Sequence, residues 1–272
     1  MMARKSLLQK PALLFGLASF LVAPLVHAAD LTIAAAASLQ DALKEMNADL
    51  EKEAGSKINV TTGASGTLTQ QIAHGAPIDI FLSAADQPIM ELEKQKLLTS
   101  TTTKAFLSND LVLIAPLKSP LKSTADLKAA SVKHIALGEP RSVPAGDYAL
   151  QALRTQKLDK ELSPKFLYAK DVRQVLAYVE RGEVEAGFVY KSDLESEAGK
   201  KVVLIQELPA ESHKAIHYTM TVVAASKNQE LAKKVLNYFE SQKAALIWTK
   251  FGFQSLGVKS ASNNKASLRA PK

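Results

Sequence analysis

Strand-like and helix-like patterns alternate along most of this chain of 272 residues. Short apolar runs such as Leu31 to Ala36 predict buried strands, whereas stretches with an apolar residue at every third or fourth position, such as Leu39 to Leu50, predict amphipathic helices. This alternation is typical of mainly parallel sheets flanked by helices. We therefore predict an α/β fold, in which ligands bind beyond the carboxyl ends of the strands, where the helices begin.

Two features of the pattern predict a division into two lobes. Asn109-Asp110 interrupts a strand-like run, and a long apolar run from His217 to Ala225 can carry the chain back to the first lobe. Two crossings of this kind would form a hinge, with a ligand cleft between the lobes. The expected parts are lobe 1 at residues 29–107 plus 217–256 and lobe 2 at residues 108–216.

Both ends of the chain are predicted to lie outside the fold. Residues 1–28 begin with basic residues, continue with an apolar run and end in Val26-His27-Ala28, a pattern typical of a cleaved secretory signal peptide. A transmembrane anchor is the alternative, but the apolar run is short and is broken by proline and glycine. Residues 257–272 are rich in Ser, Ala, Asn and Lys, which predicts a disordered basic tail. We therefore expect secretion into the periplasm.

The charge and cysteine content exclude several classes of protein. The net charge is +7, but seven of the 34 Lys and Arg residues and none of the 27 Asp and Glu residues lie in the two end segments. The remaining part carries equal numbers of basic and acidic residues, which argues against a nucleic-acid-binding face. The chain has no cysteine, which excludes disulfides, a thiol nucleophile and lipid attachment at an N-terminal cysteine.

The junctions between predicted strands and helices carry hydroxyl groups or small residues. Ser38 and Ser65 follow the first two strands, a Val-Pro-Ala-Gly turn and an Asp-Val-Arg segment open later helices, and Tyr190 ends a strand. A helix N-terminus has unpaired N–H groups and a partial positive charge, so several such ends aimed at one spot would bind an anion. Each serine could instead cap its helix, with Ser38 and Asp41 forming a capping box, and Tyr190 could be a core residue.

A site made only of uncharged donors favours a fully deprotonated oxyanion. An O–H group on a protonated ligand would face a donor and leave it unpaired. Arg173 is the one cation that could instead clamp the anion directly, as a binder of organic acids would require. Because the other candidate groups are uncharged, a supporting or surface role for Arg173 is the preferred interpretation.

Six short motifs follow one another within residues 30–253: Ala34–Leu39, Gly63–Leu68, Gly75–Ala84, Gly138–Pro140 with Val143–Ala149, Glu180–Glu183 and Gly187–Tyr190. Together they resemble the periplasmic molybdate-binding proteins of ABC importers. The resemblance implies a two-lobed periplasmic binding protein fold that closes about a hinge. It also implies a monomer that binds molybdate or tungstate, needs no cofactor and delivers the oxyanion to an inner-membrane ABC permease.

In this family, two serines, backbone N–H groups and a tyrosine hydroxyl hold the oxyanion. The resemblance implies that these groups belong to Ser38, Ser65, Ala145, Val172 and Tyr190. The chain departs from the family pattern at Ser83-Ala84-Ala85-Asp86, where the family more often has Ser-Ala-Asp. The additional alanine can shift this loop, so Asp86 is left outside the expected site.

Other functions find less support in the sequence. Sulfate or an organic acid is the alternative ligand on the same fold. The charged turn with Glu139, Arg141 and Asp147 could hold a catalytic carboxylate pair, but solvated loop charges are commoner and the chain has no catalytic triad order or phosphate loop. His213 and His217 have the spacing of a metal-binding pair but lack a nearby Glu or Cys. We therefore expect neither an enzyme nor a bare metal cation.

Overall fold

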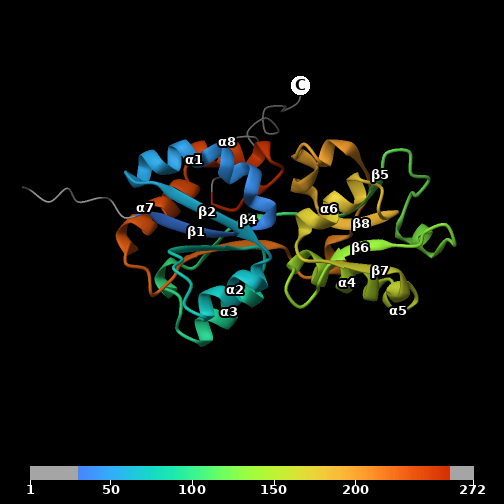
Figure 1. Cartoon of the computed structure of the whole chain (residues 1–272), viewed down its shortest axis with the longest axis horizontal. Helices are drawn as coiled ribbons and strands as arrows, with labels where there is room; N and C mark the ends of the chain where they lie inside the picture. Colours follow the sequence, from blue (N-terminus) through green and yellow to red (C-terminus); the bar gives the residue numbers. More distant parts are fainter. Residues whose placement is uncertain (1–29, 258–272) are drawn as a thin grey trace, which may run out of the picture.

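The computed structural model describes residues 30–257 and consists of two lobes, each built on one β-sheet (Figure 1). The two-lobed α/β architecture predicted from the sequence is confirmed. The predicted signal peptide, and the predicted tail apart from Gly257, lie outside the described residues. Within the described part of the chain, no helix has the length and hydropathy needed to cross a bilayer.

The first lobe contains a six-stranded sheet with the strand order β11-β4-β10-β3-β1-β2. Figure 1 shows α1 and α8 on one side of this sheet and α2 and α3 on the other. The strands are β1 (Leu31–Ala36), β2 (Ile58–Gly63), β3 (Ile80–Ser83), β4 (Lys104–Ser108), β10 (His217–Val222) and β11 (Gln254–Ser255). The helices are α1 (Gln40–Ala54), α2 (Ser65–Ala73), α3 (Asp86–Lys94), α7 (Gln229–Phe239) and α8 (Gln242–Lys250).

The second lobe contains a five-stranded sheet with the strand order β7-β6-β8-β5-β9, with α6 above it and α4 below it in Figure 1. Its strands are β5 (Leu111–Pro116), β6 (Ile135–Gly138), β7 (Phe166–Ala169), β8 (Ala186–Tyr190) and β9 (Val202–Glu207). Its helices are α4 (Pro144–Thr155), α5 (Asp159–Leu162) and α6 (Val172–Glu180). The 3-10 turns of both lobes are η1 (Ala37–Leu39), η2 (Ser100–Thr102), η3 (Thr124–Lys128), η4 (Ser163–Lys165), η5 (Lys191–Glu195), η6 (Gly199–Lys201) and η7 (Ala210–Ser212).

Both sheets are mixed, whereas the sequence predicts mainly parallel ones. Strands β1, β2 and β3 pair in parallel, as do β6, β7 and β8. Each antiparallel pair among the described strands involves β4, β5 or β10, which stand at the two crossings between the sheets. The chain passes from β4 in the first sheet to β5 in the second through Asn109 and Asp110 alone, so these two strands form one nearly continuous run that crosses between the sheets. The prediction of mainly parallel sheets is therefore wrong because of the strands that connect the lobes.

The parallel register gathers the candidate junctions at one edge of each sheet. In the first sheet, Ala36 at the end of β1 lies opposite Gly63 at the end of β2, and Ala35 lies opposite Leu82 of β3. The residues that follow these strands therefore emerge side by side. This places the start of α1, the start of α2 and the loop after β3 at a common edge, as expected for ligand sites in α/β sheets.

Two glycines let the start of α4 pack directly on the end of β6. A Cβ atom at Gly146 would lie 1.9 Å from the carbonyl oxygen of Gly138, and a Cβ atom at Gly138 would lie 2.2 Å from Cγ1 of Val143. Such distances are far inside van der Waals contact, so only glycine fits at either position without moving the backbone. This packing fixes where the N-terminal N–H groups of α4 point.

Replacing Gly146 by alanine should push α4 away from β6. We expect the free energy of unfolding to fall by about 1–3 kcal/mol, the usual cost of overpacking. Urea denaturation measures this quantity. Gly63→Ala is the matched control, because the nearest atom to its new Cβ would be Leu68 Cδ2 at 3.7 Å. Equal stability of Gly146→Ala and wild type would contradict the packing argument.

Candidate functional site

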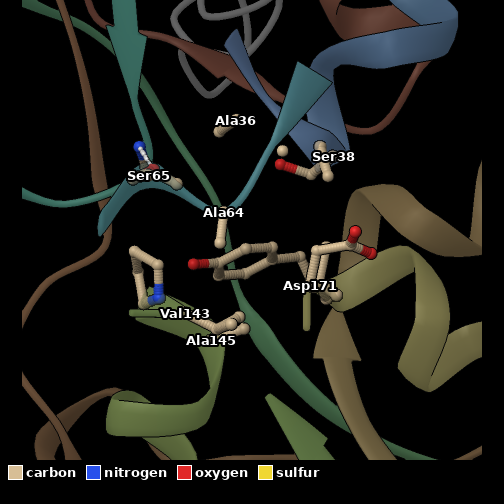
Figure 2. Close-up of a pocket in the computed structure, with 13 residues that line it drawn as sticks. Ala36, Ser38, Ala64, Ser65, Val143, Ala145 and Asp171 are labelled. Atoms are coloured by element: carbon tan, nitrogen blue, oxygen red, sulfur yellow. Dashed lines mark hydrogen bonds between the residues drawn. The ribbon is translucent and has the colours of Figure 1, made fainter. Parts of the chain in front are cut away.

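A small cavity lies between the two lobes, at the strand-to-helix junctions (Figure 2). Its enclosed volume is about 10 Å³, which is far below the usual range for organic ligands. Three segments from each lobe form its wall. The lining residues are Ala36, Ala37, Ser38, Gly63, Ala64, Ser65, Ala84, Val143, Pro144, Ala145, Asp171, Val172 and Tyr190. The structure therefore brings together all five residues that the resemblance implies.

Ser38 lies in the 3-10 turn η1 between β1 and α1, and Figure 2 shows its hydroxyl turned toward the cavity. The capping-box prediction for this residue is wrong, because α1 is preceded by Leu39 at the N-cap and has no side-chain cap. The tight turn sets Ser38 before the helix begins, and Ser38 Oγ lies 2.8 Å from the hydroxyl of Tyr218. Asp41, the expected partner in the capping box, is hydrogen-bonded by Arg173 instead.

A chain of hydrogen bonds supports one assignment of the Ser38 proton. The side-chain oxygen of Asn109 accepts from the backbone N–H groups of Asp110 and Ser192, so its amide nitrogen is the donor. That nitrogen donates to the Tyr218 hydroxyl at 3.2 Å. The Tyr218 and Ser38 hydroxyls lie 2.8 Å apart, and either oxygen can be the donor in this bond. Because Tyr218 already accepts from Asn109, we assign the proton of this bond to Tyr218. Ser38 therefore accepts from the protein and keeps its own O–H as a donor for the cavity.

Ser65 is the first residue of α2 and is arranged in the same way. The N-cap position is Ala64, and no side chain caps the helix, so the structure excludes the capping alternative for Ser65. The backbone N–H of Ala84, in the loop after β3, donates to Ser65 Oγ at 3.0 Å. This bond occupies an acceptor site of the buried hydroxyl and leaves the Ser65 O–H available to a ligand.

Two helices of the second lobe present their N-termini to the cavity. Pro144 occupies the first turn of α4, and Ala145 follows it. Asp171 caps α6 by accepting from the N–H of Gln174 at 2.9 Å, which leaves Val172 as the first residue of that helix. Within the described residues, no hydrogen bond uses the N–H of Ala145 or of Val172. Both groups are thus free donors at the positive ends of helix dipoles.

Tyr190 contributes a buried hydroxyl that has no hydrogen-bond partner among the described residues. Burial raises the pKa of this hydroxyl well above its ordinary value, so it remains protonated and can donate. The backbone N–H of Tyr190 donates to Asp193 Oδ2 at 3.0 Å, and its ring packs edge-on against Tyr218. An unpaired buried hydroxyl is costly unless a ligand accepts from it.

Arg173, the cation near the site, is paired with other groups of the protein. Arg173 does not line the cavity. Its guanidinium contacts Asp41 Oδ2 at 2.7 Å, the Ser38 carbonyl oxygen at 3.1 Å and Asp193 Oδ1 at 3.0 Å. The structure therefore favours the supporting role for Arg173 over a direct anion clamp. Asp86, which the sequence analysis leaves outside the expected site, also lies outside the lining and accepts from Thr219.

The charged groups of the turn after β6 lie apart from the cavity lining. Arg141 pairs with Glu139 on the surface and is 90% exposed, and Asp147 accepts from Gln151 on its own helix. These are solvated loop and helix charges rather than a catalytic carboxylate pair. Within residues 30–257, no three His, Asp or Glu side chains come close enough to hold a metal ion.

Sequence reasoning missed two groups that hold the site together. Tyr218 lies in the apolar run of β10, where nothing distinguishes it from a core tyrosine. Asn109 is visible in the sequence as the interruption between β4 and β5, but its contacts with Tyr218 and Ser192 span 109 and 83 residues. Local pattern cannot reveal pairs so far apart.

Comparison with known proteins gives consistent matches over the whole described part. Residues 31–254 match the family described as bacterial extracellular solute-binding protein. The chain is 38% identical over 230 residues to the molybdate-binding protein ModA of Escherichia coli, covering 82% of this chain and 88% of that one. It is 35% identical over 233 residues to ModA of Haemophilus influenzae, covering 84% and 91%. The solved structure of the Azotobacter vinelandii periplasmic molybdate-binding protein is similar in fold, with a TM-score of 0.74, 21% identity and coverage of 82% and 98%.

Replacing Arg173 by methionine removes the cation next to the Asp193 carboxylate. Burial raises the pKa of Asp193 and Arg173 opposes the rise, so the pKa should rise further in the variant. At about pH 7 we expect the free energy of unfolding to fall by about 2–4 kcal/mol, because a buried carboxylate loses its partner. A carboxyl group whose pKa is higher in the folded than in the unfolded protein lowers the stability at pH values above its pKa in the unfolded protein. Below that pKa the group is protonated in both states, so the destabilisation disappears.

The deficit of Arg173→Met should therefore shrink as the pH falls from about 7 toward 4, which urea denaturation across this range can measure. Adding Asp193→Asn to the same background should restore much of the loss. A deficit that is independent of pH, or that Asp193→Asn leaves unchanged, would contradict the assignment.

Proposed function

The chain belongs to the bacterial extracellular solute-binding protein family, and on this premise we propose that it captures molybdate, with tungstate as a close mimic, for an ABC importer. The observation that carries the proposal is a cavity whose free hydrogen-bonding groups are uncharged donors. The one carboxylate in its lining, Asp171, accepts from the N–H of Gln174 as the cap of α6. The cavity combines two serine hydroxyls, a tyrosine hydroxyl and two helix N–H groups from separate junctions. Ser38, Ser65, Ala145, Val172 and Tyr190 are the proposed ligands of the oxyanion.

Each proposed ligand can donate to the oxyanion without losing a bond within the protein. Ser38 and Ser65 accept from Tyr218 and Ala84, so their own protons are free. The hydroxyl of Tyr190 has no other partner among the described residues. A dianion with four oxygens offers only acceptors, which matches a cavity of donors. Neutral donors and helix dipoles also bind it without a full counter-charge, which keeps release feasible.

Discrimination against sulfate would follow from size. Both anions are tetrahedral, but the metal–oxygen bonds of molybdate are longer than the sulfur–oxygen bonds of sulfate. The donors are held in place by other parts of the protein, for example Ser65 by the loop after β3. Donors fixed at the wider spacing cannot all reach the smaller ion, and each contact that is lost lowers its affinity.

Binding would couple capture to closure of the lobes. The two serines belong to the first lobe, and Ala145, Val172 and Tyr190 belong to the second. An oxyanion that accepts from both sides has more contacts in the closed form than in the open form, so it shifts the population toward closure. We further propose that the protein acts as a periplasmic monomer, secreted through a cleaved signal peptide, that passes its cargo to an inner-membrane permease and catalyses no reaction.

Titration calorimetry with molybdate, tungstate and sulfate tests the proposed ligand. We expect tight binding of molybdate and tungstate and weak or no binding of sulfate. Ser38→Ala and Ser65→Ala should each weaken molybdate binding by about 1–3 kcal/mol, because an oxygen of the anion loses its donor. Ser163→Ala, which changes an exposed serine in η4 outside the cavity lining, is the control and should bind as wild type does. Tight sulfate binding without a response to molybdate would refute the ligand, and unchanged affinity in both cavity variants would refute the residues.

A further inference from the structure

We propose that Arg173 is a positioning residue that latches the two lobes together on the closed cavity and fixes the turn that carries Ser38. The inference rests on the proposed function, because it concerns how the same site is held around its anion. It assigns Arg173 no contact with the anion itself. Its partner across the cleft is Asp41, which belongs to the first turn of α1.

The Arg173 side chain reaches three segments of the chain at once. It stands on α6 in the second lobe, next to Val172. Two of its contacts cross to the first lobe: Nη1 donates to Asp41 Oδ2 at 2.7 Å, and Nη2 donates to the carbonyl oxygen of Ser38 at 3.1 Å. The second of these holds the backbone of a proposed ligand. A planar guanidinium can serve both acceptors in a fixed geometry, which an ammonium group cannot.

The third contact of Arg173 anchors it within its own lobe. Its Nε lies 3.0 Å from Oδ1 of Asp193, which is fully buried in η5. The other oxygen of Asp193 accepts from the backbone N–H of Tyr190 at 3.0 Å. The guanidinium is therefore held beside two proposed ligands of the second lobe whether or not the lobes are closed. Separation of the lobes would break only the contacts to Asp41 and Ser38.

A backbone contact closes the other side of the cavity. The N–H of Gly66 in the first lobe donates to the carbonyl oxygen of Ser142 in the second at 2.9 Å. A Cβ atom at Gly66 would lie 2.8 Å from Cα of Ser142, so a side chain there would hold the lobes apart. Ser65 and Asp171, which neighbour these two contacts in sequence, lie on opposite sides of the cavity in Figure 2. The latch and the glycine contact thus adjoin residues on opposite walls of the cavity.

The latch favours the closed form because its contacts across the cleft exist only there. A ligand that requires closure gains apparent affinity when the closed form is more populated. The side chains of Arg173 and Asp41 are 20% and 32% exposed, so solvent and salt weaken the pair without abolishing it. Loss of the pair should accordingly weaken binding by about 3- to 10-fold rather than abolish it.

The decisive variant is Asp41→Asn, because within the described residues the Asp41 side chain is paired with Arg173 alone. The matched control is Glu45→Gln, one turn further along α1. Its carboxylate pairs with Lys250 on α8 within the first lobe. Both changes remove one charge from the same helix, but only the first breaks a pair between lobes.

Titration calorimetry at low and high salt, with melting of the free protein, tests the latch. We expect Asp41→Asn to bind molybdate about 3- to 10-fold more weakly at low salt, with a smaller difference at high salt. The free protein should melt as wild type does, and Asp41→Glu should recover part of the affinity. Glu45→Gln should bind as wild type does. A merely structural role would lower the melting temperature of free Asp41→Asn along with its affinity.

The outcomes separate this inference from the proposed function. Wild type that binds molybdate while Asp41→Asn binds equally well, or weakens no more than Glu45→Gln, refutes the latch and leaves the function intact. Wild type that binds sulfate instead refutes the ligand, and the same comparison of variants is then made with sulfate. Wild type that binds neither anion refutes both.

Discussion

The structure depends on hydrogen-bond donors that have no acceptor within the protein and that lie where strands are followed by helices. The first N–H groups of a helix cannot be paired within it, and in this chain two such groups, at Ala145 and Val172, face a shared cavity. The serines on the opposite wall have their acceptor sites filled by Tyr218 and Ala84. All these groups can therefore donate and none needs to accept, which makes the cavity complementary to an anion without a facing cation.

The rest of the fold can be understood as what fixes these donors in space. Parallel register brings the ends of β1, β2 and β3 to one edge, and close glycine packing seats α4 on β6. Asn109, at the crossing between the lobes, orients the Tyr218 hydroxyl that holds Ser38. Asp193 holds the backbone of Tyr190 and pairs with Arg173, which extends to the other lobe. The hinge, the cavity wall and the contact between lobes thus share hydrogen-bonded residues.

Local pattern in the sequence was sufficient for the α/β class and for the junctions, because strands, helix starts and glycine stops are encoded by neighbours. Gly55, for example, ends α1 in the left-handed conformation that glycine adopts without strain, with φ at +64°. Local sequence pattern gave wrong predictions where contacts between distant residues determine the structure. Instead of forming the predicted capping box, Ser38 contacts Tyr218 and Arg173, which lie 180 and 135 residues away in the sequence. The antiparallel strands likewise follow from how the chain crosses between lobes, which no local period encodes.

The most direct test of this account is the location of molybdenum in a crystal of the protein grown with molybdate, found by its anomalous scattering. The account predicts a single molybdenum peak in the cavity, with anion oxygens at hydrogen-bonding distance, about 2.7–3.0 Å, from the hydroxyls of Ser38, Ser65 and Tyr190 and from the N–H groups of Ala145 and Val172. Arg173 should remain paired with Asp41 and make no contact with the anion. A peak outside the cavity, or an anion held by the Arg173 guanidinium, would contradict the account.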